Sequence, residues 1–272
     1  MATRLVALDL DGTLLNNQKE IEEPVLARIK QLSGDEVHFV IVTGRMYCSA
    51  VRYARQVGQV LPLTCLNGTM IKDVATDETL YHNPLRPELA RVVVERVNEL
   101  PVHTFLYDND CLLLRSVPDE LREYFGRTSV RFEMTEDLVG RVTGQISQVM
   151  LAGQDSLIQE ARRQLEEENG HRLEFFFYPS RMLSSFAYLE IKNPGDSKGC
   201  GLRMLREMLG VSREEVMAIG DYDNDLSLFE ESGLRIAMQN ASEALKARAD
   251  RVTTRTNDEG GVLEALDFAF SR

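Results

Sequence analysis

The stretch Leu5-Val6-Ala7-Leu8-Asp9-Leu10-Asp11-Gly12-Thr13 determines the fold that this sequence predicts. Its first four residues are apolar, as in a buried strand, and they lead directly into two carboxylates, a glycine and a hydroxyl. In an open parallel sheet, ligands bind just outside the carboxyl ends of the strands. We therefore expect Asp9 and Asp11 to lie at the ligand-binding edge of such a sheet.

Three further apolar runs are each followed directly by polar residues and glycine. They are residues 37–42 before Thr43-Gly44-Arg45, residues 63–66 before Asn67-Gly68, and residues 216–219 before Gly220-Asp221-Tyr222-Asp223-Asn224-Asp225. Clusters that are far apart in the sequence would meet at one edge of the parallel sheet. This edge would then carry carboxylates, a hydroxyl, amides and backbone that glycine leaves accessible. Such groups together suit a magnesium ion and a phosphate group.

The pattern along the chain predicts two domains. Apolar spacing typical of amphipathic helices, as at residues 22–32, alternates with the strand-like runs and indicates right-handed crossovers. After Pro84 the pattern changes to shorter strands and helices, and it changes back after Asn193. We predict an α/β fold, with a Rossmann-like doubly wound parallel sheet core in residues 1–83 and 193–272. An inserted α+β domain would occupy residues 84–192.

Composition and charge restrict the class of protein. The net charge of −12 argues against nucleic acid or an anionic membrane as a partner, since both favour a basic patch. The four cysteines are scattered without a CxxC pair, so neither a zinc site nor a disulfide framework is indicated. The chain enters its first strand directly, and no apolar run approaches the ~18–20 residues of a membrane span. We expect a cytoplasmic protein that is a monomer or a weak homo-oligomer.

The paired carboxylates of Asp9 and Asp11 call for a cation, because two such groups repel each other at this spacing. A hard divalent ion such as Mg²⁺ prefers carboxylate oxygen and would satisfy that need. One carboxylate could then attack phosphorus, and the other could protonate the leaving oxygen and later activate water. Taken alone, the pair could equally cap a helix or lie in a polar loop.

Other residues add to this reading. Thr43 offers a hydroxyl, Gly44 allows close approach of a phosphate oxygen, and Lys198 at the start of a helix supplies a point charge. Asp221 follows a strand and suits a metal, with the Asn224 amide three residues later. Each of these features alone would be an ordinary turn or a solvated side chain.

Together, these residues resemble the haloacid dehalogenase superfamily in order and spacing. The matching motifs are Asp9-Leu10-Asp11-Gly12-Thr13, Thr43-Gly44-Arg45, Lys198 and Gly220-Asp221-x-x-Asn224-Asp225. The long insert is similar to the large α/β cap (type IIB) of the Cof-type sugar-phosphate phosphatases. The resemblance extends over essentially the whole chain, including Asn67-Gly68.

The resemblance implies a role for each matching residue. Asp9 would be the nucleophile and a Mg²⁺ ligand, and Asp11 the general acid/base and a ligand through its backbone oxygen. Asp221 would be the third protein ligand of the metal. Asp225 would orient Lys198 or the metal-bound waters. The phosphoryl group would be held by the Leu10 backbone, Thr43, Gly44, Lys198 and Asn224.

Other residues are candidates for contact with the part of the substrate beyond the phosphoryl group. Arg45 would either pair within the core or contact the substrate, and Asn67 and Gly68 are further candidates. In the insert, Arg181 would either meet a second anionic group or be solvated. Large caps of this type exclude macromolecules, so the resemblance implies a small phosphorylated metabolite as the partner.

The sequence therefore predicts a Mg²⁺-dependent phosphatase that hydrolyses sugar phosphates or similar metabolites through an aspartyl-phosphate. Two alternatives remain open: a phosphomannomutase-like phosphotransferase, and a non-catalytic sensor of a phosphorylated metabolite. The Asp9/Asp11 pair counts against the sensor, since binding needs no nucleophile. The GxxxxGK[ST], GxGxxG and HExxH motifs are missing, and no histidine falls in a cluster, so a phosphohistidine mechanism has little support.

Overall fold

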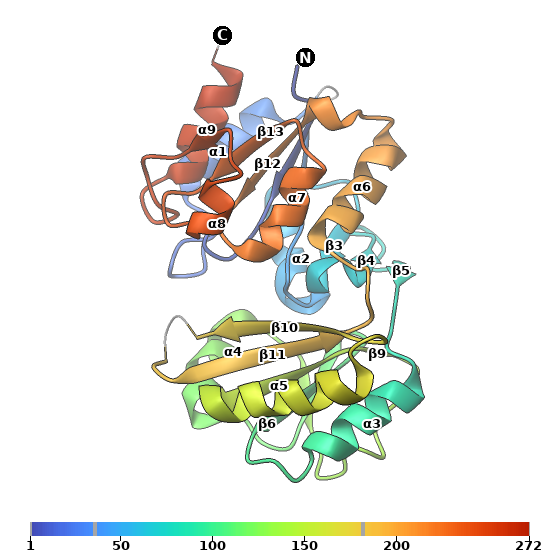
Figure 1. Cartoon of the computed structure of the whole chain (residues 1–272). Helices are drawn as coiled ribbons and strands as arrows, with labels where there is room; N and C mark the ends of the chain where they lie inside the picture. The colour runs from blue at the N-terminus through green and yellow to red at the C-terminus, as the bar shows by residue number, and fades with distance from the viewer. Residues whose placement is uncertain (1, 35–36, 181–182, 272) are drawn as a thin grey trace. The chain divides into compact units, whose positions relative to one another are not determined.

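The computed structural model describes residues 2–34, 37–180 and 183–271. The chain forms two compact units, the first from Met1–Tyr81 and Asp196–Arg272, and the second from His82–Gly195 (Figure 1). The first contains a parallel sheet and the second a largely antiparallel one. The predicted α/β fold class with an additional α+β domain is confirmed.

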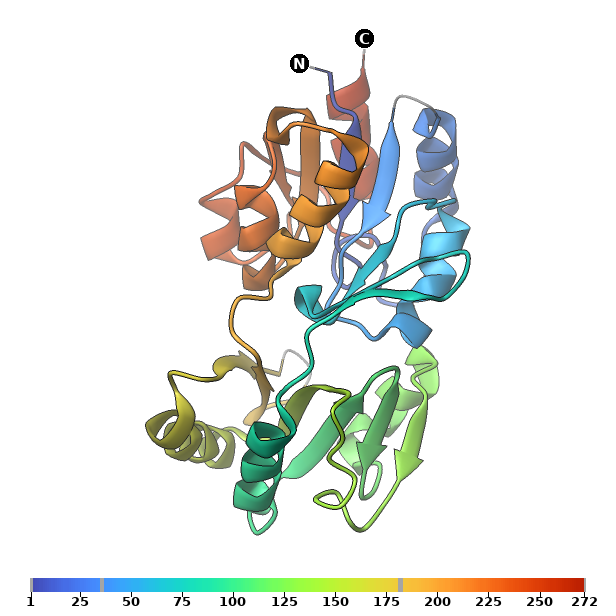
Figure 2. The ribbon, with the colours of Figure 1, turned by 90° about the vertical axis from the view of Figure 1, so that its right-hand side faces the viewer.

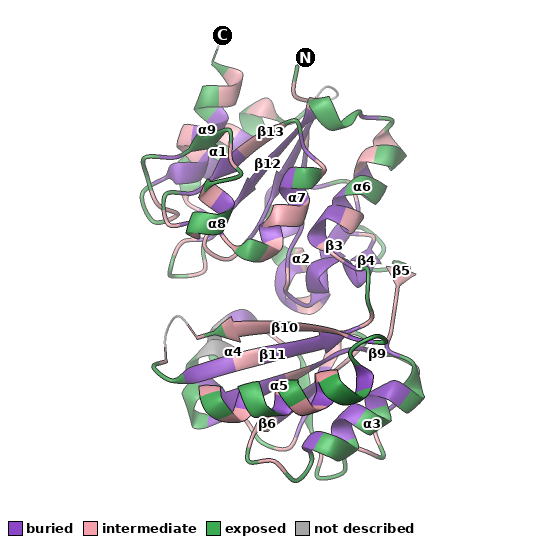
Figure 3. Cartoon of the chain, in the orientation of Figure 1, coloured by how far each residue is buried: buried purple, intermediate pink, exposed green. Residues whose placement is uncertain are grey.

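A five-stranded parallel sheet forms the centre of the first unit. Its order is β14-β13-β12-β1-β2. The strands are β1 (Leu5–Leu8), β2 (His38–Ile41), β12 (Val216–Gly220), β13 (Leu234–Ala237) and β14 (Arg251–Val252). All four residues of β1 are buried, because this strand lies between β2 and β12 and helices cover both faces of the sheet. The neighbouring strand β12 is also buried along its length (Figure 3). The central strand therefore directs Asp9 to the middle of the sheet edge.

Helices cover both faces of this sheet, as the doubly wound topology requires (Figure 2). Helix α1 packs against α9, and α6 packs against α7. In α1, Pro24 lies in the first turn, and Val25, Leu26 and Ile29 form the buried face. The helices are α1 (Glu23–Leu32), α2 (Tyr47–Gln56), α6 (Lys198–Leu209), α7 (Leu226–Glu230), α8 (Glu243–Lys246) and α9 (Gly261–Phe270), with 3₁₀ turns η1 (Leu66–Gly68), η3 (Arg213–Glu215) and η4 (Asp223–Asp225).

The third predicted strand belongs to a different sheet, which corrects the expectation that residues 63–66 extend the parallel sheet. Strands β3 (Leu63–Cys65), β4 (Met70–Lys72) and β5 (Thr79–His82) form a separate three-stranded sheet. A bridge between Val42 and Thr64 joins β3 to the end of β2. The tight turn at Asn67-Gly68 folds the chain back on itself, so β3 pairs antiparallel with β4.

The second unit has a six-stranded sheet in the order β10-β11-β9-β6-β7-β8. Its strands are β6 (His103–Asp108), β7 (Cys111–Leu114), β8 (Phe132–Met134), β9 (Ile146–Gln154), β10 (Glu174–Pro179) and β11 (Phe186–Lys192). Its helices are α3 (Pro87–Val97), α4 (Arg122–Thr128) and α5 (Asp155–Asn169), with the 3₁₀ turn η2 (Asp119–Leu121). Apolar residues of α3 and α5 pack against alternate residues of β9 and β11, such as Leu151 and Leu189, and form a separate core.

Among the residues that the structure describes, no helix has both the length and the apolar character to cross a membrane.

Candidate active site

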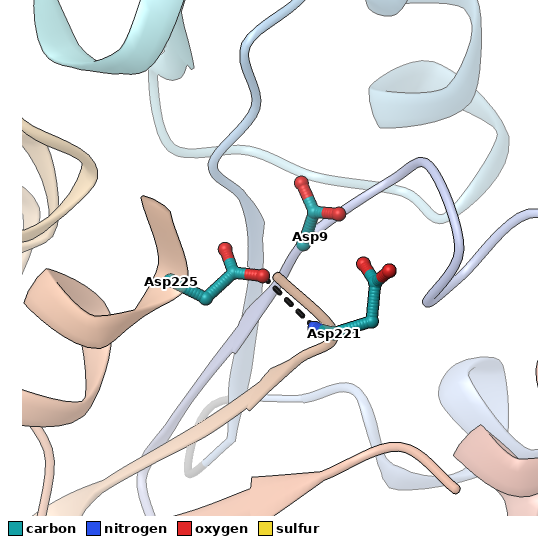
Figure 4. Close-up of side chains that lie close together, drawn as sticks. All are labelled: Asp9, Asp221 and Asp225. Atoms are coloured by element: carbon teal, nitrogen blue, oxygen red, sulfur yellow. Dashed lines mark hydrogen bonds between the residues drawn. The ribbon is translucent and has the colours of Figure 1, made fainter. Parts of the chain in front are cut away.

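Three aspartates converge at the carboxyl edge of the parallel sheet (Figure 4). Asp9 follows β1, Asp221 follows β12, and Asp225 ends the 3₁₀ turn η4. One carboxylate oxygen of each lies within 4.8 Å of the others, and all three residues are buried. The backbone N–H of Asp9 donates to the carbonyl of Ile219 at 3.2 Å, so the sheet itself fixes the position of Asp9 relative to β12.

Lys198 lies between two of these carboxylates. Its Nζ is 2.6 Å from Oδ1 of Asp9 and 2.6 Å from Oδ1 of Asp225, and only 2% of its side chain is exposed. Lys198 is the first residue of α6, whose start is fixed by the Ser197 hydroxyl accepting from the Cys200 N–H. Burial opposes the charge on Lys198, but Asp225 and Asp9 outweigh that effect and raise the pKa of Lys198.

Asp225 accepts hydrogen bonds from three neighbouring groups. Its Oδ2 accepts from the backbone N–H groups of Asp221 (2.9 Å) and Tyr222 (3.1 Å), while Oδ1 binds Lys198. Both oxygens of Asp225 are therefore engaged by protein. Asp221 accepts a hydrogen bond from the Thr13 hydroxyl at 3.2 Å. This arrangement leaves Asp9 and Asp221 as the carboxylates best placed to hold a cation.

The charge of this cluster suits a divalent metal. Three buried carboxylates face one ammonium, so negative charge is in excess. Burial raises the pKa of Asp9 well above its ordinary value; Lys198 opposes this rise, and Asp225 and Asp221 add to it. A hard cation beside Asp9 and Asp221 would offset this charge and keep Asp9 ionised. The donor set, all oxygen, therefore fits Mg²⁺.

Asp11 points to different partners. Arg45 binds it with two hydrogen bonds, Nε to Oδ2 at 2.5 Å and a terminal nitrogen to Oδ1 at 2.7 Å. Lys19 Nζ lies 2.7 Å from Oδ1. Desolvation would raise the pKa of Asp11, but Arg45 and then Lys19 outweigh it and lower the pKa to about 2. Of the two roles considered for Arg45, the structure contains the ion pair within the core.

The motif at the end of β2 meets the Asn67-Gly68 turn. The hydroxyl of Thr43 accepts from the Arg45 N–H at 3.1 Å, and its carbonyl accepts from the Asn67 N–H at 3.1 Å. A Cβ on Gly44 would lie 3.1 Å from Oδ1 of Asn67. The Nδ2 of Asn224 donates to the same Oδ1 at 3.0 Å. The end of β2, the turn η1 and the turn η4 are thus joined around the side-chain amide of Asn67.

The remaining predicted residues fall into three cases. Leu10 is fully buried, with its carbonyl accepting from the Leu15 N–H at 2.9 Å. Gly68 has φ of +94°, and a Cβ there would lie 2.1 Å from the carbonyl oxygen of Ser197, next to Lys198. Arg181 lies outside the described residues.

Three residues of this site were not predicted from the sequence. Lys19 lies in the loop between β1 and α1, where no periodic pattern marks it. Thr13 ends the first motif without a predicted role, and its hydroxyl donates a hydrogen bond to Asp221. Asn240 donates from Nδ2 to the carbonyl of Gly12 at 2.8 Å, a contact between segments far apart in the chain that spacing alone does not indicate.

The comparison with known proteins agrees with this geometry. A 5-amino-6-(5-phospho-D-ribitylamino)uracil phosphatase of Bacillus subtilis is 30% identical over 269 residues, which cover 98% of this chain and 97% of the relative. A pyridoxal phosphate phosphatase of Escherichia coli is 28% identical over 267 residues, covering 93% of each chain.

Solved structures give the same result. A haloacid dehalogenase-like hydrolase from Bacteroides thetaiotaomicron superposes with a TM-score of 0.87 at 28% identity, covering 98% of this chain and all of that one. A Thermotoga maritima protein superposes with a TM-score of 0.84 at 30% identity, covering 98% and 97%. The family profile of haloacid dehalogenase-like hydrolases matches residues 6–266. With the strand-end aspartates and this match over nearly the whole chain, the protein belongs to the haloacid dehalogenase-like hydrolase family.

Proposed function

We propose that this hydrolase is a Mg²⁺-dependent phosphatase of small phosphorylated metabolites that works through an aspartyl-phosphate on Asp9. The observation that carries the proposal is the buried group of Asp9, Asp221 and Lys198 at the carboxyl ends of adjacent parallel strands. Relatives named as phosphatases of a ribitylamino-uracil phosphate and of pyridoxal phosphate support a metabolite substrate.

The carboxylates of Asp9 and Asp221 and the backbone oxygen of Asp11 would hold the metal. When bound, Mg²⁺ supplies positive charge that offsets the phosphoryl oxygens and the buried carboxylates. Thr43, Gly44, Lys198, Asn224 and the Leu10 backbone would hold the phosphoryl group, and Asp225 would keep Lys198 in place.

The proposed reaction has two steps, each passing through Asp9. In the first, a carboxylate oxygen of Asp9 bonds to phosphorus while the phosphorus–oxygen bond to the leaving group breaks. The leaving oxygen takes the electron pair of that bond and a proton from the Asp11 carboxyl group. In the second, Asp11 takes a proton from water as the water oxygen bonds to phosphorus. The bond from phosphorus to Asp9 breaks, and inorganic phosphate leaves.

This role for Asp11 requires a change in its surroundings. With a pKa of about 2, the carboxyl group bound to Arg45 and Lys19 is ionised at neutral pH and has no proton to give. Asp11 must therefore leave these partners before it protonates the leaving oxygen. The Lys19 side chain is 28% exposed and that of Arg45 only 3%, so the contact with Lys19 is the more easily broken.

We further propose that the second unit is the cap, with residues 84–192 selecting the leaving group. It has its own apolar core, so its loops can differ from those of relatives without disturbing the strand-end aspartates. The cytoplasmic location remains a prediction from the sequence.

The test is phosphate release from a panel of phosphorylated sugars, nucleotides and p-nitrophenyl phosphate, with Mg²⁺ or with chelator. Asp9→Asn should lower turnover at least about a thousandfold, because the amide is a poor nucleophile. Asp223→Asn is the matched control, since Asp223 is an exposed aspartate at the start of η4 whose carboxylate accepts a hydrogen bond from the Ser242 hydroxyl.

Four outcomes would contradict the proposal. Turnover that persists in chelator excludes the metal, and turnover that persists in Asp9→Asn excludes the nucleophile. Transfer of the phosphoryl group to a sugar hydroxyl in preference to water would identify a phosphotransferase. Binding of a phosphorylated metabolite by folded, Mg²⁺-loaded protein with no turnover of any substrate would identify a sensor.

A further inference from the structure

Asn67 lies where three segments of the phosphate site in the first unit meet. These segments are the end of β2, the turn η4 and the start of α6. We propose that Asn67 is a positioning residue that fixes the amide of Asn224 for phosphate binding, and that it does not itself contact the substrate. The inference rests on the proposed role of Asn224 in holding the phosphoryl group.

The hydrogen bond between the two amides determines how Asn224 is oriented. Nδ2 of Asn224 donates to Oδ1 of Asn67 at 3.0 Å. A side-chain amide nitrogen carries two N–H donors, so one is used by Asn67 and the other remains for an acceptor. A phosphoryl oxygen is such an acceptor. Asn67 thus selects the face of the Asn224 amide that can bind phosphate.

Asn67 can act in this way because its own position is fixed. Its backbone is left-handed, with φ of 52°, a conformation that asparagine tolerates better than most residues. Its N–H donates to the carbonyl of Thr43 at 3.1 Å, and its side chain lies against Gly44. Asn67 is 8% exposed, so little water competes for its Oδ1. By contrast, Asn224 is only half-buried, and its side-chain amide donates to Asn67.

The neighbouring glycine links this pair to the lysine of the site. Gly68 packs so closely on the Ser197 carbonyl that a Cβ would lie 2.1 Å from its oxygen. Ser197 caps the helix that begins with Lys198. The turn therefore determines the spacing between Asn224 and Lys198, the two residues that would hold phosphoryl oxygens from different elements.

The test is a double-mutant cycle read by inhibition with inorganic phosphate, using p-nitrophenyl phosphate as the substrate. Asn67→Gly keeps the left-handed backbone but removes the amide, and Asn224→Ala removes the phosphate donor. We expect inhibition constants raised about fivefold to tenfold by either change, the effect of one hydrogen bond. The double variant should bind phosphate no more weakly than Asn224→Ala, because Asn67 acts through Asn224.

Asn109→Gly is the matched control. Asn109 also has a left-handed backbone, with φ of 53°, but lies exposed in the turn between β6 and β7 of the second unit. This variant should leave the inhibition constant unchanged. If Asn67→Gly does not fold, Asn67→Ala also removes the amide oxygen without adding charge, at the cost of a non-glycine residue in the left-handed backbone, and its cycle with Asn224→Ala must still be non-multiplicative.

The outcomes separate this inference from the proposed function. If Asn224→Ala binds phosphate as the wild type does, the assigned role of Asn224 is wrong. If Asn224→Ala weakens binding but Asn67→Gly does not, the positioning role is overturned. The positioning role is also overturned if the two substitutions raise the inhibition constant by factors that multiply in the double variant. That result would show that Asn67 acts independently of Asn224, through stability or direct contact.

Discussion

Asp11 is held in a state other than the one that its proposed role as an acid needs. Its carboxylate accepts three hydrogen bonds from Arg45 and Lys19, while the acid role needs a protonated group. The resemblance to known phosphatases predicted the role of Asp11, and only the three-dimensional structure reveals these partners. The sequence left two roles open for Arg45, because an arginine after Thr43-Gly44 can form an ion pair within the core or contact the substrate.

The Asp11 contacts predict a pH dependence of stability. The pKa of Asp11 is lowered from 3.8 to about 2 by folding, so the folded state binds this proton less readily than the unfolded chain. The ionised group therefore stabilises the protein above pH 3.8, and this contribution is lost as the pH falls towards 2. With 38% of the side chain exposed, we expect about 1 kcal/mol.

The measurement is the free energy of unfolding in urea, with chelator present, as a function of pH. Asp11→Asn should be less stable than wild type near pH 6, and the difference should vanish near pH 2. A difference that stays constant over this range would show that the carboxylate contributes through packing and not through its charge.

The turn η1 leaves no space for a side chain at Gly68, because the backbone of this residue lies against the backbone of Ser197. Gly68→Ala would place a Cβ 2.1 Å from the Ser197 carbonyl oxygen, at a φ of +94°. We expect a loss of more than about 2 kcal/mol of unfolding free energy, together with weaker phosphate inhibition, as the start of α6 is displaced.

Gly58→Ala provides the comparison for that substitution. Gly58 also has a positive φ, +73°, but no atom lies within 4 Å of where its Cβ would be. It should cost about 1 kcal/mol and leave phosphate inhibition unchanged. Equal losses in the two variants would show that backbone conformation, and not the contact with Ser197, determines the cost.

The same elements show where sequence reasoning succeeds and where it stops. The run Leu5–Leu8 is continuously apolar and the apolar pattern of α1 has helical periodicity, so both elements were predicted within a residue or two. Strand β3 was predicted, but its sheet was not, because three residues do not specify which neighbour they pair with. Strands β4 and β8 are equally short and were not predicted, because three residues are too few to show an alternating pattern.

At the scale of the whole molecule, the division into two units makes a prediction about folding. The second unit, His82–Gly195, contains helices on an antiparallel sheet and an apolar core made of its own residues. Expressed alone, this fragment should unfold cooperatively, as followed by circular dichroism in urea, because it buries enough apolar surface for its size. A fragment without a cooperative transition would show that its core needs the rest of the chain.

The place of β1 between β2 and β12 also has a consequence for the order of events during synthesis. During translation, β1 and β2 are synthesised early, but β12 is synthesised only after the entire second unit. Until then the nascent chain has Asp9 without Lys198, Asp221 or Asp225, and one edge of its central strand lacks a partner. The growing polypeptide therefore cannot act on cellular phosphates, and a prematurely terminated one would be inert and prone to aggregate.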